Sequence, residues 1–195
     1  MIHAKEFNIL SLQFSIFTPG LQFSTNRVLS SLVSKFVDTF DGNTTTLPLP
    51  QDAPMEIPRI ILPSADGRLK LEIAISRANF FRYLSREEAV IDDSSFFKIC
   101  LEVFKEYIAC TNAKVGRLAI VAVKFIKEEN PGLALAKHFC KDEWIKQPFN
   151  RLESFEIHSH KKYILNGFRI NSWVRCKSGF LKKDNVKIIL VEQDI

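Results

Sequence analysis

Two tight turns, each flanked by segments that alternate between apolar and polar residues, constrain the fold of this chain more than any other feature. The first is the segment SADG at 64–67, between apolar runs at 57–62 and 68–75. The second is the dipeptide NG at 166–167, which is the strongest short-range signal for a two-residue β-hairpin. Because short turns join antiparallel neighbours, both signals predict a mainly antiparallel sheet.

The strand at 68–75 separates its side chains onto two faces. Leucine and isoleucine occupy one face, while charged residues of both signs occupy the other: Leu69, Leu71, Ile73 and Ile75 against Arg68, Lys70 and Glu72. Apolar residues at helical spacing predict helices over 25–40 and 92–109. We expect the apolar face of the strand to pack beneath these two helices.

The remaining elements complete an α+β pattern. Alternating or apolar segments predict further strands, and Pro131 opens a short helix over 131–139; the strands are expected near 7–17, 114–126, 152–165, 168–177 and 186–195. The element order is β-α-β-β, a long helix, then β-α-β-β-β. We therefore predict an α+β fold with a curved, mainly antiparallel sheet of about seven strands, built from two β-α-β-β units with the helices packed on one face.

This element order suits one domain. The chain has 195 residues, of which 46% are apolar, enough for a sizeable core. We predict a single domain over 1–195 with an internal pseudo-repeat of elements at 6–83 and 114–177. The last strand stops on Asp194 and Ile195, so we expect either that it is tied into the sheet to its end or that a following segment has been truncated.

Composition and cysteine usage indicate a soluble protein of a reducing compartment. Four cysteines include no C-x-x-C pair, no signal peptide opens the chain, and no apolar stretch reaches transmembrane length. We therefore predict a cytoplasmic location and no membrane partner. The net charge of +5 is modest for a dedicated nucleic-acid binder, and most of the 17 phenylalanines are expected in the core.

No catalytic motif is present. The sequence contains no Gly-rich phosphate loop, no Walker motif, no G-x-S-x-G and no H-E-x-x-H. His138 and Cys140 are only two residues apart, and on a helix such a pair points in different directions, which prevents joint nucleophilic chemistry unless the helix has already ended. We predict no catalytic residue and no cofactor, and favour binding over catalysis.

Two histidines are the candidate metal ligands. His158 and His160 stand at i and i+2 on an expected strand, so that both imidazoles project from one face. A zinc site requires further ligands, for which the sequence offers only His138, Cys140 and Asp142. The alternative is two polar residues on a solvated strand face.

Basic and aromatic residues on the hairpins are the candidate binding residues. The first hairpin carries Arg68 and Lys70, and one face of the strand after the NG turn carries Arg169, Asn171, Trp173 and Arg175. A face of this kind can stack a base and contact phosphate. It is equally typical of a solvated antiparallel face, or of a protein interface anchored on Trp173.

Several segments resemble a family of bacterial α+β proteins of unknown function. The segments IPRIILPSADGRLKLEIAISRANFFRY, KVGRLAIVAVKF and GFRINSWV occur in that order, and the chain ends in VEQDI. The resemblance implies the strand–helix order given above, with a last strand that continues into an Asp-Ile-Asn-Thr-like segment. It implies no activity, cofactor or site residue.

Together these observations favour a non-enzymatic cytoplasmic binding or assembly module, which binds protein, either a second copy of itself or another chain. Two alternatives stay open. One is a nucleic-acid-binding protein that uses the basic and aromatic strand face. The other is a metal-dependent enzyme built around His158 and His160.

Overall fold

The computed structural model describes residues 2–20, 23–50, 52–84, 91, 93–181 and 185–195. In this part of the chain there are four α-helices and nine strands. The helices are α1 (Thr25–Lys35), α2 (Asp93–Thr111), α3 (Pro131–Phe139) and α4 (Asp142–Lys146), with a 3-10 helix η1 (Ala4–Glu6) before them. The strands are β1 (Asn8–Phe17), β2 (Thr45–Thr46), β3 (Ile60–Pro63), β4 (Leu69–Ile73), β5 (Arg77–Tyr83), β6 (Arg117–Lys127), β7 (Glu156–Leu165), β8 (Phe168–Leu181) and β9 (Val186–Asp194).

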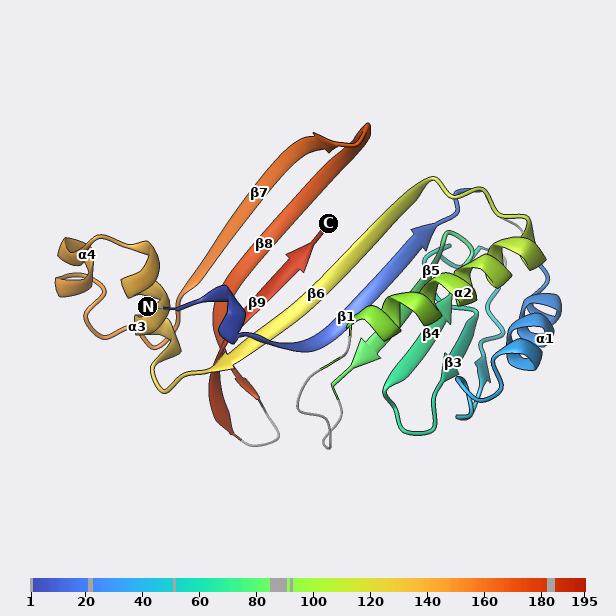
Figure 1. The fold of residues 1–195 in the computed structure, drawn as a ribbon, viewed down its shortest axis with the longest axis horizontal. Helices are drawn as coiled ribbons and strands as arrows, with labels where there is room; N and C mark the ends of the chain where they lie inside the picture. Colours follow the sequence, from blue (N-terminus) through green and yellow to red (C-terminus); the bar gives the residue numbers. More distant parts are fainter. Residues whose placement is uncertain (1, 21–22, 51, 85–90, 92, 182–184) are drawn as a thin grey trace. The chain divides into compact units, whose positions relative to one another are not determined.

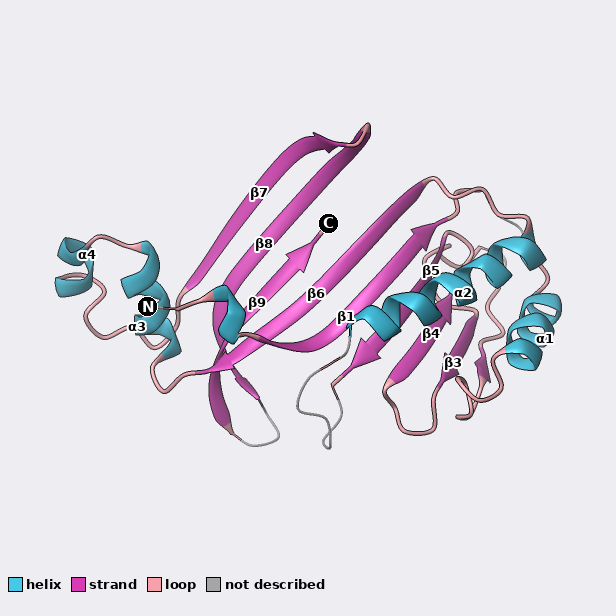
Figure 2. Ribbon diagram, in the orientation of Figure 1, coloured by secondary structure: helices cyan, strands magenta, loops and turns pink. Residues whose placement is uncertain are grey.

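The chain folds as two compact units, and its class is α+β with antiparallel strand pairing, as predicted. One unit comprises Ser11–Ile120, which we call the Phe80 unit. The other comprises Met1–Leu10 and Val121–Ile195, which we call the Trp173 unit. Figure 1 shows the course of the chain through both, and Figure 2 shows its helices and strands.

In the Phe80 unit the strands follow the order β2-β3-β4-β5-β1, and all neighbours are antiparallel. The register places Phe80 on β5 between Leu71 on β4 and Phe14 on β1. Directly paired residues of antiparallel strands point to the same face. These three side chains therefore belong to one apolar face, on which Leu71 and Phe80 are fully buried.

The helices of this unit cover that apolar face. The Phe80 ring stacks on Phe96 of α2 at 5.4 Å, and it meets Phe40 edge-on at 5.8 Å. Phe14 meets Phe97 of α2 edge-on at 6.2 Å, and it contacts Phe104 of the same helix in a tilted arrangement at 5.7 Å. A chain of aromatic contacts thus joins α2 and the segment after α1 to the sheet, in agreement with the packing expected from the sequence.

The first helix is shorter than predicted, ending at Lys35 rather than near residue 40. Phe36 leaves the helical region with φ −121° and ψ 36°, while its N–H still bonds the Leu32 carbonyl. The following turn keeps Phe36 and Phe40 buried but leaves Val37 exposed. Tertiary packing of the two rings therefore ends the helix, although the sequence spacing alone continues it.

The described strands number nine rather than about seven, because β2 and β5 were not expected. β2 has only two residues, too few for a periodic pattern. β5 follows β4 through residues 74–76, whose sequence AIS contains a serine but no glycine, proline, asparagine or aspartate. A single hydrogen bond from Ala74 N–H to the Arg77 carbonyl (2.8 Å) closes this turn.

In the Trp173 unit the strands follow the order β6-β9-β8-β7, again antiparallel throughout. α3 packs on β8 and β9, where Leu135, Ala136 and Ile189 are buried. Gly132 allows α3 to approach the segment before β7 closely, since a Cβ there would lie 3.0 Å from the backbone of Glu153. β7 lies at the end of the order, and β8 is its only strand neighbour in the part of the chain that the structure describes.

The two units share one order of elements. In each, a long strand is followed by helical structure and then by a meander of three antiparallel strands. The last strand of the meander returns to pair with the first: β5 with β1, and β9 with β6. The additional strand β2 interrupts this order in the Phe80 unit.

Candidate binding surface on the β7–β8 hairpin

The NG dipeptide forms the tight turn between β7 and β8 that its sequence predicts. Asn166 has φ 49° and Gly167 has φ 83°, and a type I′ turn requires positive φ at both central residues. The turn pairs Leu165 with Phe168, and this register continues for ten pairs to Glu156 and Lys177. The result is the long hairpin labelled β7 and β8 in Figure 1.

One face of this hairpin gathers four of the predicted binding residues. Arg169, Asn171, Trp173 and Arg175 alternate along β8, and their direct partners on β7 are Ile164, Lys162, His160 and His158. Because directly paired residues point to the same side, these eight side chains share a face, which we call the Trp173 face.

At the centre of the Trp173 face, His160 covers Trp173. The two rings stack with centroids 4.0 Å apart and planes 6° from parallel. The Nε2–H of His160 donates to Asn171 Oδ1 at 2.6 Å, which fixes the position of the imidazole over the indole. His160 therefore serves as part of an aromatic platform at the surface, with Trp173 partly exposed beneath it.

Acidic residues border this platform on the next strand. Asp194 on β9 is paired with Trp173, and Glu192 is paired with Arg175. The Arg175 guanidinium donates to Glu192 Oε1 at 3.2 Å. The inner part of the Trp173 face is therefore mixed in charge, which makes it poorly suited to a phosphate backbone.

His158 has a separate contact. Its Nε2 lies 2.8 Å from Oε1 of Glu156, the next residue on the same side of β7. Both candidate metal ligands thus have their Nε2 engaged by neighbouring side chains. Across the residues that the structure describes, no group of three or more His, Cys, Asp and Glu side chains is placed to hold a metal ion.

The other two predicted binding residues, Arg68 and Lys70, belong to the Phe80 unit, where each forms local ion pairs. Arg68 Nε lies 2.9 Å from Asp66 Oδ2. Lys70 Nζ lies 2.8 Å from Glu72 Oε1 and 4.7 Å from the centre of the Phe81 ring. Burial lowers the pKa of Lys70, but the hydrogen bonds and charge interactions with Glu72 and Tyr83 together outweigh burial and raise the pKa above the ordinary value.

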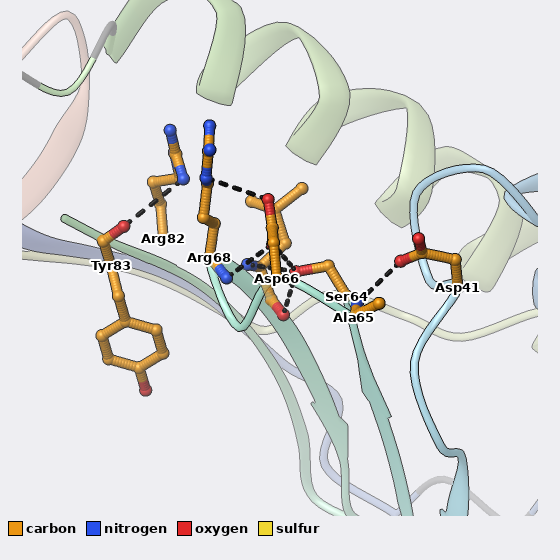
Figure 3. A network of polar contacts seen from close by, with 8 residues as sticks. Asp41, Ser64, Ala65, Asp66, Arg68, Arg82 and Tyr83 are labelled. Carbon is orange, nitrogen blue, oxygen red and sulfur yellow. Dashed lines mark hydrogen bonds and ion pairs between the residues drawn. The ribbon is translucent and has the colours of Figure 1, made fainter. Parts of the chain in front are cut away.

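Figure 3 shows why Arg68 does not share a face with Lys70. The Arg68 and Arg82 side chains point to one side of the sheet, whereas the Tyr83 ring points to the other. Lys70 lies 5.6 Å from the centre of the Tyr83 ring and so belongs to the Tyr83 side. The turn before β4 rotates Arg68 out of the alternation that the sequence predicts.

The SADG turn is a hydrogen-bonded network rather than a recognition loop. Asp66 Oδ1 accepts from Ser64 Oγ at 2.6 Å and from the Arg68 N–H at 2.8 Å. Asp41 Oδ1 accepts from the Ala65 N–H at 2.7 Å, which ties the turn to the segment after α1 (Figure 3). These contacts occupy the polar groups of the turn and give it an architectural role.

His138 lines a surface hollow of about 470 Å³ between η1, β6 and α3. The carboxylates in this hollow already accept local hydrogen bonds, Glu6 from His3 N–H at 3.0 Å and Glu128 from Asn130 N–H at 3.2 Å. α3 ends at Phe139, so Cys140 lies just beyond the helix. Within the described residues, no hydrogen bond joins Cys140 to His138.

The exposed apolar end of the hairpin was not predicted from the sequence. Ile164 is 73% exposed, Leu165 54% and Phe168 71%. These residues lie directly beside the NG turn. Because a two-residue turn is itself exposed to solvent, apolar residues next to it are the sequence signal that could have predicted an exposed apolar surface. We call Ile164, Leu165 and Phe168 the hairpin tip.

The outer edge of β7 carries backbone groups that pair with no other described strand. The Ser178 N–H bonds the Phe155 carbonyl at 3.0 Å, just before the first pair of the hairpin. Because hydrogen-bonded and non-hydrogen-bonded pairs alternate in an antiparallel ladder, the odd-numbered residues of β7 bond to β8. The N–H and C=O groups of the even-numbered residues therefore point to the free edge, at Glu156, His158, His160, Lys162 and Ile164.

Most of the net charge of the protein is concentrated on the same hairpin. Residues 156–177 contain five lysines and arginines against one glutamate, whereas the whole chain has a net charge of +5. The protein therefore has a local basic region on this hairpin, although its overall net charge is modest.

The sequence matches no known protein-family model, and no curated protein is similar to it. Throughout the described residues, no helix is both long enough and apolar enough to cross a membrane.

Proposed function

We propose that this protein is a non-enzymatic binding module that adds an extended, acidic segment of a partner protein to the free edge of β7. The observation that carries the proposal is the edge itself: a ten-residue strand whose even-numbered backbone groups have no strand partner among the described residues. Such an edge binds an extended peptide through main-chain hydrogen bonds, while side chains supply the specificity.

The side chains of β7 favour an acidic partner. His158, His160, Lys161 and Lys162 lie along the strand, with Glu156 as its single acidic residue. Opposite charges directly across a strand pair stabilise it, and like charges destabilise it. Alternating acidic residues in the partner strand therefore complement β7.

The same charges disfavour pairing between two β7 edges. An antiparallel pair of identical strands brings the lysines and histidines of both copies close together near its centre. Lysine on an edge strand is a common means by which proteins prevent edge-to-edge association. A different protein is therefore a better partner for this edge than a second copy of the chain.

The stacked rings of His160 and Trp173 supply an anchor beside the edge. Because they lie on the outer two strands of the unit, a strand added to β7 places its side chains next to His160. Large aromatic residues at such positions contribute strongly to protein interfaces. The acidic residues Glu192 and Asp194, on the side away from the edge, favour this partner over nucleic acid.

The test uses a synthetic peptide of alternating glutamate and valine, long enough to span β7, and the full chain. Fluorescence anisotropy is expected to detect binding that weakens with salt, whereas a peptide with lysine in place of glutamate does not bind. Amide exchange measured by NMR is expected to slow at His158, His160 and Lys162 when the acidic peptide is bound.

Two variants at one position separate the backbone from the side chain. His160→Pro removes an edge N–H, a change that edge strands tolerate, and His160→Ala removes the ring alone. We expect His160→Pro to weaken binding beyond His160→Ala by about fivefold, the value of one hydrogen bond of about 1 kcal/mol. Equal affinity of both variants, or equal binding of the lysine peptide, would contradict the proposal.

A further inference from the structure

The hairpin tip is apolar on both faces of the hairpin. Leu165 and Phe168 are a direct pair and share one face, while Ile164 pairs with Arg169 and lies on the other. Ile164 and Phe168 are the two most exposed large apolar side chains among the described residues, at 73% and 71%. A flat protein partner covers only one face of a hairpin, whereas an apolar medium surrounds both.

Basic residues lie beside and behind this tip, also on both faces. Lys162 and Arg169 lie on the face of Ile164, and Lys161 lies on the face of Leu165. Lys161 Nζ sits 5.1 Å from the centre of the Tyr163 ring, so that an aromatic residue stands at the same level as the cations. We call Lys161, Lys162 and Arg169 the basic collar; within the described residues, none of the three has an acidic partner within ion-pair distance.

We propose that the hairpin tip inserts into the surface of an anionic lipid bilayer, with the basic collar in contact with the lipid headgroups. Apolar side chains at the end of the hairpin, with cations and an aromatic residue beside and behind them along the strands, match the layers of a membrane surface. Strand residues advance by about 3.3 Å each, so the tip and turn reach about 5–10 Å below the collar. This is the depth at which surface-bound segments place their apolar residues.

The mode of attachment is shallow and reversible. Such attachment needs no membrane-spanning segment. The prediction of no membrane partner was based only on the lack of an apolar stretch of transmembrane length in the sequence, and so it does not address this mode of binding. The two-residue turn holds the tip in a defined conformation before binding, which lowers the entropic cost of insertion. This inference uses the end of the hairpin and does not depend on the proposed peptide site along the edge of β7.

The test is co-sedimentation of the full chain with large vesicles of phosphatidylcholine, either alone or mixed with phosphatidylserine. We expect binding to the mixed vesicles that weakens as salt increases, and little binding to phosphatidylcholine alone. A Phe168→Trp variant provides a measure of depth, since brominated lipids quench a tryptophan that enters the bilayer. Quenching in excess of that of the native Trp144 and Trp173 is expected.

Matched variants separate the tip from the rest of strand β8. Phe168→Ser is expected to reduce vesicle partitioning about tenfold or more, whereas Phe180→Ser, which alters a 60% exposed phenylalanine on the same strand, leaves it unchanged. Arg169→Glu is expected to reduce partitioning about fivefold for each unit of charge changed. Lys177→Glu, on the same face but at the other end of the hairpin, is expected to have a smaller effect.

Three outcomes overturn the proposal. The first is a lack of binding to the mixed vesicles, and the second is equal loss in Phe168→Ser and Phe180→Ser. The third is a dimer in solution that Phe168→Ser abolishes, because it assigns the tip to a second copy of the chain. His160→Pro is expected to leave vesicle binding intact and Phe168→Ser to leave peptide binding intact, so that each proposal fails separately.

Discussion

Tyr107 on α2 illustrates how a single residue is governed by burial rather than by hydrogen bonding. Its side chain is fully buried, and its hydroxyl has no hydrogen-bond partner among the described residues. Burial raises the pKa of the phenol to about 12, against a smaller opposing effect of the nearby Thr18 hydroxyl. The ring therefore contributes packing to the Phe80 unit, and the hydroxyl contributes only the cost of its own desolvation.

The variant Tyr107→Phe tests this assignment. The hydroxyl loses its hydrogen bonds to water on folding and gains none in the protein, so its removal takes away an unfavourable contribution. We therefore expect the free energy of unfolding to stay the same or rise by about 1 kcal/mol. Tyr107→Ala, which removes the ring, is expected to cost about 3–5 kcal/mol. Urea denaturation followed by circular dichroism measures both, and a clear loss of stability in Tyr107→Phe would show that the hydroxyl has a partner.

At the scale of elements, the Phe80 ring is the main link between the sheet and its helices. It stacks on Phe96 of α2 and meets Phe40 after α1, and its own side chain is fully buried. The hydrogen bonds of β5 hold it in register between β4 and β1. Loss of this ring therefore loosens three elements at once.

We expect Phe80→Ala to lower the free energy of unfolding by about 3–5 kcal/mol, because it leaves a cavity between α2 and the sheet. The matched control is Phe180→Ala, since Phe180 is exposed on β8 and its removal is expected to change stability by no more than about 0.5 kcal/mol. Thermal and urea unfolding of the two variants compare them directly. Similar losses in both would mean that burial does not determine the contribution of these rings.

The elements that could be predicted are those with local signals. The NG turn specified both β7 and β8, and Pro131 marked the start of α3. β5 had no such signal, because the turn before it contains a single serine and no glycine, proline, asparagine or aspartate. The end of α1 depends on the packing of Phe40 against Phe80 on β5, a contact between distant residues that no local sequence pattern predicts.

The same distinction applies to the candidate site. The alternation of side chains along β8 is enough to predict that Arg169, Asn171, Trp173 and Arg175 share one face. The stack of His160 on Trp173 was not predicted, although the two-residue turn fixes the pairing of the two strands and therefore this contact. Glu192 beside Arg175 depends on the order of β8 and β9, which the turn signals do not determine.

At the scale of the whole molecule, the two units differ in how their strands are protected. In the Phe80 unit the buried face of β4 and β5 lies under aromatic side chains from α2. In the Trp173 unit, β7 is exposed along nearly its whole length, and among the described strands it has a neighbour on one side only. The first unit therefore holds the stable core, and the second presents a long, open strand to partners.

Native-state amide exchange measured by NMR tests this contrast residue by residue. We expect the slowest exchange in β4, β5 and α2, and an alternating pattern along β7, because only its odd-numbered amides bond to β8. Ser159 and Lys161 are thus expected to exchange more slowly than His158, His160 and Lys162. Uniform protection along β7 in the isolated protein would mean that its edge is already covered, and would contradict an edge that is open to partners.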